Sequence, residues 1–206
     1  MKDFNIFKQQ IADDPWIMTT QKETPKEWTK RVRLKDGISV LLRPELSTDL
    51  EMLWEMFSTL SVESLRFLPK PFPRERVESW IENLNYDRVL PILAVVEEDS
   101  EERIVASATL TFSQAEVFKH KAEFGITVHD DYQDRGLGTA LTKHMIEIAR
   151  SKGLKKITLT VVTENSRAIR VYEKCGFRIE GGLEKDHYNY ITGEYGDDYI
   201  MALFLP

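Results

Sequence analysis

The chain has 206 residues, of which 42% are hydrophobic and 30% charged, so it is long enough to bury the core of one domain. Its net charge is -6 with both signs interspersed, which argues against nucleic acid as a partner and suits a cationic substrate such as an amine. The single cysteine, Cys175, excludes an internal disulfide, and the four histidines form no HExxH pattern, so we expect no metal.

The N-terminus begins with mixed charge and has no long apolar run, so we expect no signal peptide, no membrane association and a cytoplasmic protein. Phe4, Phe7 and Ile11 share one helical face and predict a short amphipathic helix. We assign residues 1–30 to an extension that packs on a single domain spanning 31–206. The apolar side chains of this extension leave a monomer and a homodimer both open.

Residues 31–42 alternate apolar and polar side chains around Asp36-Gly37, which predicts a hairpin of two short strands. Helical spacing of apolar residues then predicts two amphipathic helices, over 48–60 with Thr48 as its N-cap and over 74–84. A proline-rich connector separates the two helices.

Three segments rich in β-branched residues, 91–97, 103–112 and 121–128, predict a β-meander. In the third of these strands Glu123 shares a face with Gly125, because side chains alternate between the two faces of a sheet. A carboxylate therefore lies in the middle of this strand beside a glycine.

A glycine-bearing loop follows that strand and opens a long amphipathic helix that begins at Gly138 and closes at Gly153. Gly136 and Gly138 leave room for backbone amides to approach a ligand, and the helix directs free amides and its positive end to the same point. This arrangement predicts an anion site for a phosphate or pyrophosphate. Position 141 is leucine rather than the third glycine of a dinucleotide-binding fingerprint, and the lysine of a Walker loop is absent.

The chain then alternates strand and helix once more. Residues 154–162 predict a strand, and a short helix begins at the N-cap Asn165 and stops at Gly176. The last segment, 188–204, predicts a hairpin.

Two of these segments carry a family resemblance. The sequence Gln133-Asp-Arg-Gly-Leu-Gly138 resembles the Q/R-x-x-G-x-G/A signature of the GCN5-related N-acetyltransferase (GNAT) superfamily, whose loop grips the pyrophosphate of coenzyme A. The segment Asn165 to Phe177 is similar to the second signature, N-x-x-A-x-x-x-Y-x-x-x-G-F. Its matching residues are Asn165, Ala168, Tyr172, Gly176 and Phe177. Both signatures occur in the right order with a helix and a strand between them, so the chain is identified as a member.

The resemblance implies an α/β (α+β) fold with a mixed, mostly antiparallel sheet of about seven strands, flanked by helices. Strands 121–128 and 154–162 would splay apart at the centre to admit the pantetheine arm, which would bond to the backbone of Ile126 and Val128. Asn165, Ala168 and Tyr172 would also contact this arm. The pyrophosphate would be surrounded by Gln133, Asp134, Arg135, Gly136, Leu137, Gly138 and Thr139.

Acetyl transfer requires a base, an oxyanion donor and a proton donor for the leaving group. A primary amine with a pKa near 10.4 is almost fully protonated at neutral pH, so a base must take its proton, and we choose Glu123 with Glu180, Glu184 and Asp186 in reserve. The backbone N–H of Val128 is the candidate oxyanion donor. In the family, a tyrosine at the position of Tyr172 protonates the leaving thiolate.

We therefore expect an N-acetyltransferase that uses acetyl-CoA as cosubstrate and a small amine or amino compound as acceptor, by direct attack in a ternary complex. Cys175 is expected to fill core space rather than to carry the acyl group. Residues 35–44 and 60–67 also look similar to the start of the acetyltransferase domain in protein lysine acetyltransferases. A protein lysine or N-terminal amine is thus the alternative acceptor, and a non-catalytic acyl-CoA sensor is the alternative to an enzyme.

Overall fold

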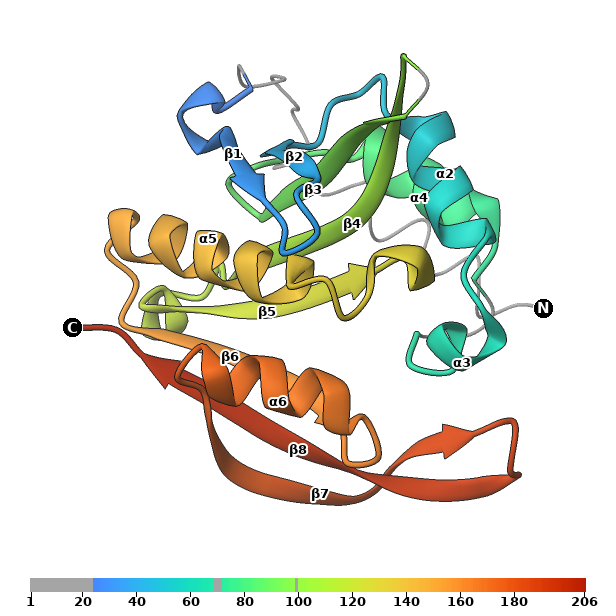
Figure 1. Cartoon of the computed structure of the whole chain (residues 1–206). Helices are drawn as coiled ribbons and strands as arrows, with labels where there is room; N and C mark the ends of the chain where they lie inside the picture. The colour runs from blue at the N-terminus through green and yellow to red at the C-terminus, as the bar shows by residue number, and fades with distance from the viewer. Residues whose placement is uncertain (1–23, 69–71, 99) are drawn as a thin grey trace, which may run out of the picture.

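The computed structural model describes residues 24–68, 72–98 and 100–206, so the helix expected around Phe4 and Ile11 lies outside the described residues. Its centre is an eight-stranded sheet with the order β1-β2-β3-β4-β5-β6-β8-β7 (Figure 1). The strands are β1 (Lys30–Arg33), β2 (Ser39–Pro44), β3 (Val89–Glu98), β4 (Glu101–Phe112), β5 (Lys121–Val128), β6 (Lys156–Val162), β7 (Arg178–Asn189) and β8 (Glu194–Phe204).

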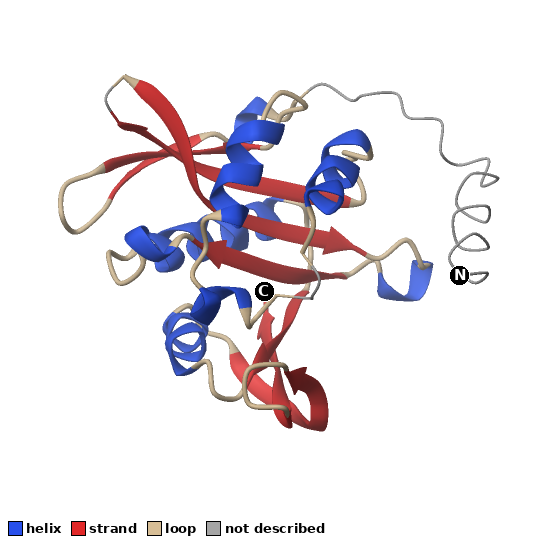
Figure 2. Cartoon of the chain, turned by 90° about the vertical axis from the view of Figure 1, so that its right-hand side faces the viewer, coloured by secondary structure: helices blue, strands red, loops and turns tan. Residues whose placement is uncertain are grey.

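Helices cover both faces of this sheet (Figure 2). The α-helices are α2 (Leu50–Ser58), α3 (Val62–Leu65), α4 (Arg74–Glu82), α5 (Leu137–Ser151) and α6 (Ser166–Lys174). Short 3-10 turns occur at η1 (Lys26–Trp28), η2 (Glu116–Phe118) and η3 (Asp130–Tyr132). Within the described part of the chain, no helix has the length and apolar character needed to cross a membrane.

The first half of the sheet follows the chain order. Strands β1 to β5 pair antiparallel with their sequence neighbours, which confirms the predicted hairpin and the meander. The C-terminal hairpin is also present, but β8 rather than β7 pairs with β6. The sequence did not indicate this inserted position, because the two strands are almost equally long, with 12 and 11 residues, and strand order depends on tertiary packing.

The predicted splay lies between β5 and β6. These two strands are parallel and pair only at Lys121 with Lys156, Ala122 with Ile157 and Glu123 with Thr158. Beyond that point β5 continues to Val128 without a partner on this side. The mixed, mostly antiparallel sheet with a central splay is therefore confirmed.

Strand β3 is buried on both faces, which explains why its sequence reads as a nearly continuous apolar run. Ile92 and Ala94 face the core cluster that includes α5, whereas Leu93 and Val95 face the cluster formed with α2 and α4. The sheet thus has a core on each side, and the face of α2 and α4 also carries the cavity described below.

Two predicted boundaries differ from the structure. Helix α2 has Asp49 rather than Thr48 at its N-cap, and the Asp49 carboxylate accepts hydrogen bonds from Arg43 instead of capping the helix. Helix α5 starts at Leu137, one residue before Gly138, because Gly136 already serves as its N-cap.

Candidate active site

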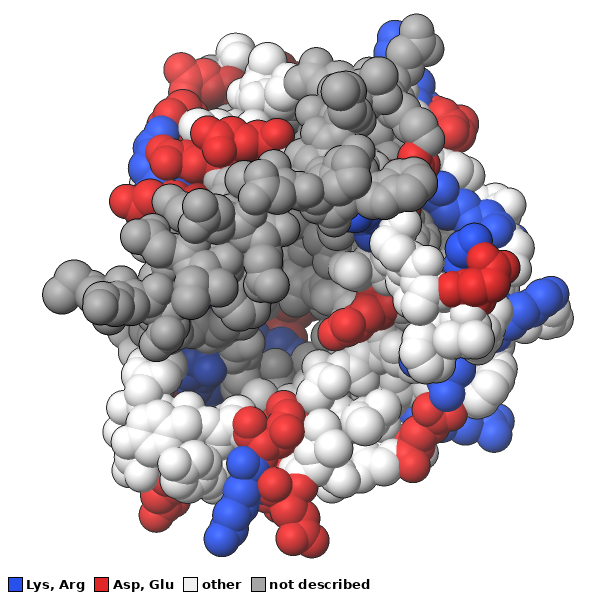
Figure 3. Space-filling view, turned by 180° about the vertical axis from the view of Figure 1, so that it is seen from behind, with Lys and Arg blue, Asp and Glu red and all other residues white. Residues whose placement is uncertain are grey.

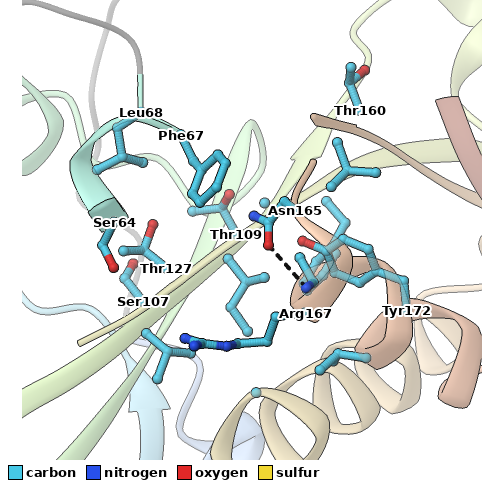
Figure 4. A pocket seen from close by; sticks show the side chains of 18 of the residues that line it. Ser64, Phe67, Leu68, Ser107, Thr109, Thr127, Thr160, Asn165, Arg167 and Tyr172 are labelled. Carbon is cyan, nitrogen blue, oxygen red and sulfur yellow. Dashed lines mark hydrogen bonds between the residues drawn. The ribbon is translucent and has the colours of Figure 1, made fainter. Parts of the chain in front are cut away.

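The splay opens into one large cavity of about 1710 Å³. Its floor includes Thr109 on β4 and Thr127 on β5. Two of its walls are residues 61–68, here called the α3 segment, and helix α6. Figure 4 shows Ser64, Phe67 and Leu68 on one side of this space, with Asn165 and Tyr172 on the other (Figure 4). Polar hydroxyls thus line the sheet between an apolar rim and the helix of the second sequence signature.

The unpaired edge of β5 faces this cavity. The N–H of His129 donates to the carbonyl of Val105 at 2.9 Å, on the β4 side. Successive backbone N–H groups of a strand point to opposite sides, so those of Val128 and Ile126 point toward β6, where β5 has no strand partner. Both residues line the cavity, together with Gly125, which precedes Ile126 on the same strand.

The glycine loop lies at the end of β5. Gly136 has a φ of +91°, in the left-handed region that a side chain disfavours. It precedes the first turn of α5, where the N–H groups of Leu137, Gly138 and Thr139 have no partner within the helix. Leu137 is fully buried and does not line the cavity, whereas Gly136, Gly138 and Thr139 do.

Gln133 holds the elements of the site together. Its side-chain nitrogen donates to the carbonyl of Val128 at 3.0 Å and to Oγ of Ser64 at 3.1 Å. Its side-chain oxygen accepts a hydrogen bond from Arg167 of α6. Gln133 therefore connects β5, the α3 segment and α6, a role that the loop signature alone did not reveal.

The α3 segment is fixed to the same strand end. Asp130 accepts hydrogen bonds from the backbone N–H of Ser61 at 2.8 Å and from Oγ of Ser64 at 2.6 Å. Burial acts to raise the pKa of Asp130, but these hydrogen bonds together outweigh it and hold the pKa below its ordinary value. The wall that carries Phe67 is thus tied to the residues that follow Val128.

Basic residues near the loop differ in their position. The Arg135 guanidinium contacts Asp36 at 3.2 Å and stacks over Tyr132, and Arg135 is not a lining residue of the cavity. The basic residues that do line the cavity are Lys35, Arg76, Arg88, Arg66, Arg167, Arg170 and Lys174. Three of them lie on α6, where helical spacing could have placed them beside the loop.

The α6 signature residues occupy this wall. Oδ1 of Asn165 accepts from the N–H of Ala168 at 3.1 Å, which confirms Asn165 as the N-cap. Its amide nitrogen has no hydrogen bond to another described residue and is left for a ligand. Tyr172 lines the cavity, is 7% exposed, and burial raises its pKa to about 12. Its phenol therefore remains a proton donor at neutral pH.

The predicted base, Glu123, lies at the edge of this arrangement. It is exposed on β5, opposite Thr111 and on the same face as Gly125, and it is not a lining residue of the cavity. The reserve Glu180 is paired with Lys156 at 2.6 Å. The other two reserves, Glu184 and Asp186, are exposed on β7 and also lie outside the cavity lining.

Other carboxylates do line the cavity and were missed from the sequence. Asp198 on β8 is 7% exposed and accepts a hydrogen bond from Nδ1 of His187 at 2.6 Å. Nε2 of this histidine lies 3.8 Å from Glu164, and its ring leaves no room for a side chain at Gly196. Glu45, at the other end of the cavity, is 3% exposed. Asp198 reaches the site because β8 lies beside β6 in the sheet, and Glu45 reaches it because it follows the end of β2.

Charges of both signs are mixed on the described surface behind the sheet, without one continuous basic area (Figure 3). A hollow opens on this face, with charged side chains at its edge. The cavity lining is likewise mixed, so recognition there depends on individual groups rather than on one overall charge.

Comparison with known proteins gives consistent findings. Residues 52–177 match the family model described as the acetyltransferase (GNAT) family. The chain is 36% identical to the L-amino acid N-acetyltransferase AaaT of Escherichia coli over 138 residues, which is 66% of this chain and 80% of that protein. It is 29% identical to the spermidine N(1)-acetyltransferase of Escherichia coli over 174 residues, which is 81% of this chain and 86% of that protein.

A solved structure shares the fold. The spermidine N-acetyltransferase from Vibrio cholerae in complex with CoA and spermine superposes with a TM-score of 0.66 at 20% sequence identity. The match covers 80% of this chain and 95% of that one.

Proposed function

Because the chain belongs to the acetyltransferase (GNAT) family and is an acyltransferase, we propose that it transfers the acetyl group of acetyl-CoA to a primary amine of a small molecule. The observation that carries the proposal is the unpaired edge of β5. Ile126 and Val128 open into the same cavity as the Gly136 turn and Tyr172, so donor and acceptor can meet there.

The residues around the splay fit the parts of acetyl-CoA. The free amides at Gly138 and Thr139 suit its pyrophosphate, as do the cations Arg167 and Arg170 of α6, which line the same cavity. The backbone of Ile126 and Val128 suits the amides of the pantetheine arm, because it offers the hydrogen bonds of an open strand edge. When bound, acetyl-CoA would supply the thioester that the amine attacks.

Residues of the chain then stabilise the charge on the thioester oxygen and protonate the departing sulfur. The N–H of Val128 is our proposed donor to the thioester oxygen, on which negative charge develops. The phenol of Tyr172, held protonated by its raised pKa, is our proposed donor to the departing sulfur. The α6 cap at Asn165 positions Tyr172 and leaves an amide to hold the pantetheine.

Removal of the acceptor's proton requires a base, and two carboxylates compete for this role. Glu123 remains our first proposal, because it shares the face of Gly125 and can act through a water. Asp198 is the second, because it lines the cavity directly and is oriented by His187. Attack then occurs in a ternary complex without an acyl-enzyme, since the pKa of Cys175 is raised by burial and its thiol is not activated.

The acceptor class follows from the relatives and the cavity together. The two curated relatives named above act on an L-amino acid and on spermidine, which are both small amines. The cavity is concave and lined by individual polar and charged groups, which suits the binding of an acceptor of this size.

Release of free thiol from acetyl-CoA tests the function directly. The purified full chain is incubated with acetyl-CoA and, in separate reactions, with polyamines, amino acids, aminoglycosides or lysine peptides. We expect at least one small amine to raise thiol release well above the hydrolysis background. A chain that binds coenzyme A and releases no thiol with any of these amines would be a sensor, and the proposal would be wrong.

A further inference from the structure

Glu45 is a buried carboxyl group inside the cavity that the steps above do not use. It follows β2, and its backbone is fixed at both ends: its N–H donates to the carbonyl of Pro91 at 3.1 Å, and its carbonyl accepts from the hydroxyl of Tyr86 at 2.6 Å. Its residue exposure is only 3%, and it lines the cavity. Among the described residues, its carboxylate has no hydrogen bond and no ion pair.

Arg43, the cation that lowers the pKa of Glu45, is already paired with another carboxylate. Arg43 forms two hydrogen bonds with Asp49, at 2.6 and 2.8 Å, so its charge is largely compensated. Burial, followed by the negative charge of Asp49, raises the pKa of Glu45 to about 8, and the charge of Arg43 only partly offsets this. Arg43, Asp49 and the phenol of Tyr86 are the titratable groups that act on it. A buried carboxyl group to which the described residues offer no partner calls for an explanation, and a cationic ligand supplies one.

The register of the sheet fixes how far Glu45 lies from the splay. The backbone pair of Glu45 with Pro91 continues the ladder of β2 with β3. Pro91 is opposite Thr109, and Thr109 is opposite Gly125 on β5. All four residues therefore form one row on one face, and all four line the cavity.

This row sets the distance between Glu45 and the splay. Three strand spacings separate Glu45 from Gly125, which is about 14 Å between their Cα atoms. A glutamate side chain that extends along the row leaves roughly 10 Å to the splay, or about eight bonds of an extended chain. Glu45 is thus too far from the splay to take the proton of the reacting amine, but it can bind the opposite end of the acceptor.

We propose that Glu45 anchors a second ammonium group of an elongated, dicationic acceptor, a long diamine or polyamine, while the first amine reaches the splay. The assignment rests on the proposed function and names its substrate class. Binding replaces the proton of the Glu45 carboxyl group with the ligand's ammonium group and releases that proton to solvent. An α-amino acid cannot bridge the row, because its two charged groups are only a few bonds apart.

A series of acceptors of increasing length tests this distance. Linear α,ω-diamines of increasing length are compared with n-alkylamines of equal length, with kcat/KM as the readout. We expect the long diamines, near eight bonds between nitrogens, to exceed the matching monoamines by at least about tenfold. The Glu45→Gln variant, which keeps size and removes charge, should lose this advantage and leave the monoamines within about twofold.

Two further variants make the test specific. Glu45→Asp keeps the charge but withdraws it by one bond, so the preferred diamine should become longer by about one methylene. Glu82→Gln removes an exposed carboxylate of α4 that is not a lining residue of the cavity, and it should leave the diamine advantage unchanged. Thermal unfolding of each variant checks that the fold is intact.

The outcomes separate the two proposals. An equal diamine advantage in wild type and Glu45→Gln, or a preference for amino acids over diamines, would overturn the anchor and leave acetyl transfer standing. Absence of thiol release with every amine would instead overturn the proposed function. Calorimetry of 1,7-diaminoheptane binding, in two buffers of different ionisation enthalpy, then still tests whether Glu45 binds the second ammonium group. Proton release that is lost in Glu45→Gln supports it, and no binding or no proton release contradicts it.

Discussion

The side-chain nitrogen of Gln133 lies 3.0 Å from the carbonyl oxygen of Val128, so the loop after β5 holds the last residue of the splayed strand. The same nitrogen also donates to Ser64, and through it the α3 wall is fixed to the strand that would carry the thioester.

Replacing Gln133 with leucine removes all three hydrogen bonds of its side chain, each of which contributes about 0.5–1.5 kcal/mol. We expect a higher KM for acetyl-CoA and faster amide hydrogen exchange over residues 61–68. Gln114→Leu, on the loop after β4, is the control and should change neither quantity. Unaltered exchange at α3 in Gln133→Leu would contradict the proposed connection.

Tyr172→Phe should lower kcat by roughly 10²- to 10⁴-fold, because it removes the proton donor and keeps the ring. The Kd for coenzyme A should change little. Since the pKa of Tyr172 is raised to about 12, its ionisation should not limit the wild-type rate on the alkaline side. Steady-state kinetics and direct binding measure the two quantities, and a parallel loss of both would exclude the acid role.

The two carboxylates that compete for the base can be separated by isosteric changes. If Glu123 is the base, Glu123→Gln lowers kcat/KM by roughly 10²-fold or more and removes the acidic limb of the pH–rate profile. Asp198→Asn then has a smaller effect. The reverse order would assign the role to Asp198. In that case His187→Gln should also reduce the rate, because His187 orients Asp198. Full activity in both single variants would reject both candidates.

Gly136→Ala should lower the free energy of unfolding by about 1–2 kcal/mol, because alanine strains the left-handed conformation at φ +91°. Gly138→Ala is the matched control. Its added Cβ would lie 3.8 Å from Val128 and 4.0 Å from Val171, which are ordinary contacts. Denaturant unfolding of both variants tests the contrast, and equal stabilities would contradict it.

Glu45 makes stability depend on pH. Its pKa is raised from 4.5 to about 8 in the folded chain, so its stabilising contribution is complete below pH 4.5 and is lost as pH rises through about 8. Over this window the free energy of unfolding should fall by up to about 1.4 kcal/mol per pH unit from this group. Glu45→Gln should show a flatter profile in denaturant titrations at several pH values. The same slope in both proteins would mean that Glu45 is not the source.

Local sequence determined much of the fold. The turn at Asp36-Gly37, the alternation along β4 and β5 and the glycines around α5 each act on neighbouring residues, so their structures could be predicted without long-range contacts. The same applies to the cap at Asn165, whose side chain binds an amide three residues on. Together with the two signatures, these elements indicated the family and the place of the splay.

Tertiary structure alone decided which groups share the cavity. Glu45 lies far from Gly125 in the sequence, and only the register from β2 to β5 places both on one row. Asp198 reaches the site because β8 inserts beside β6, and Glu123 lies outside the lining although it follows the expected alternation. Sequence periodicity fixes which face a side chain takes. Strand order and burial fix its neighbours and its pKa, because both depend on residues that are distant in the chain.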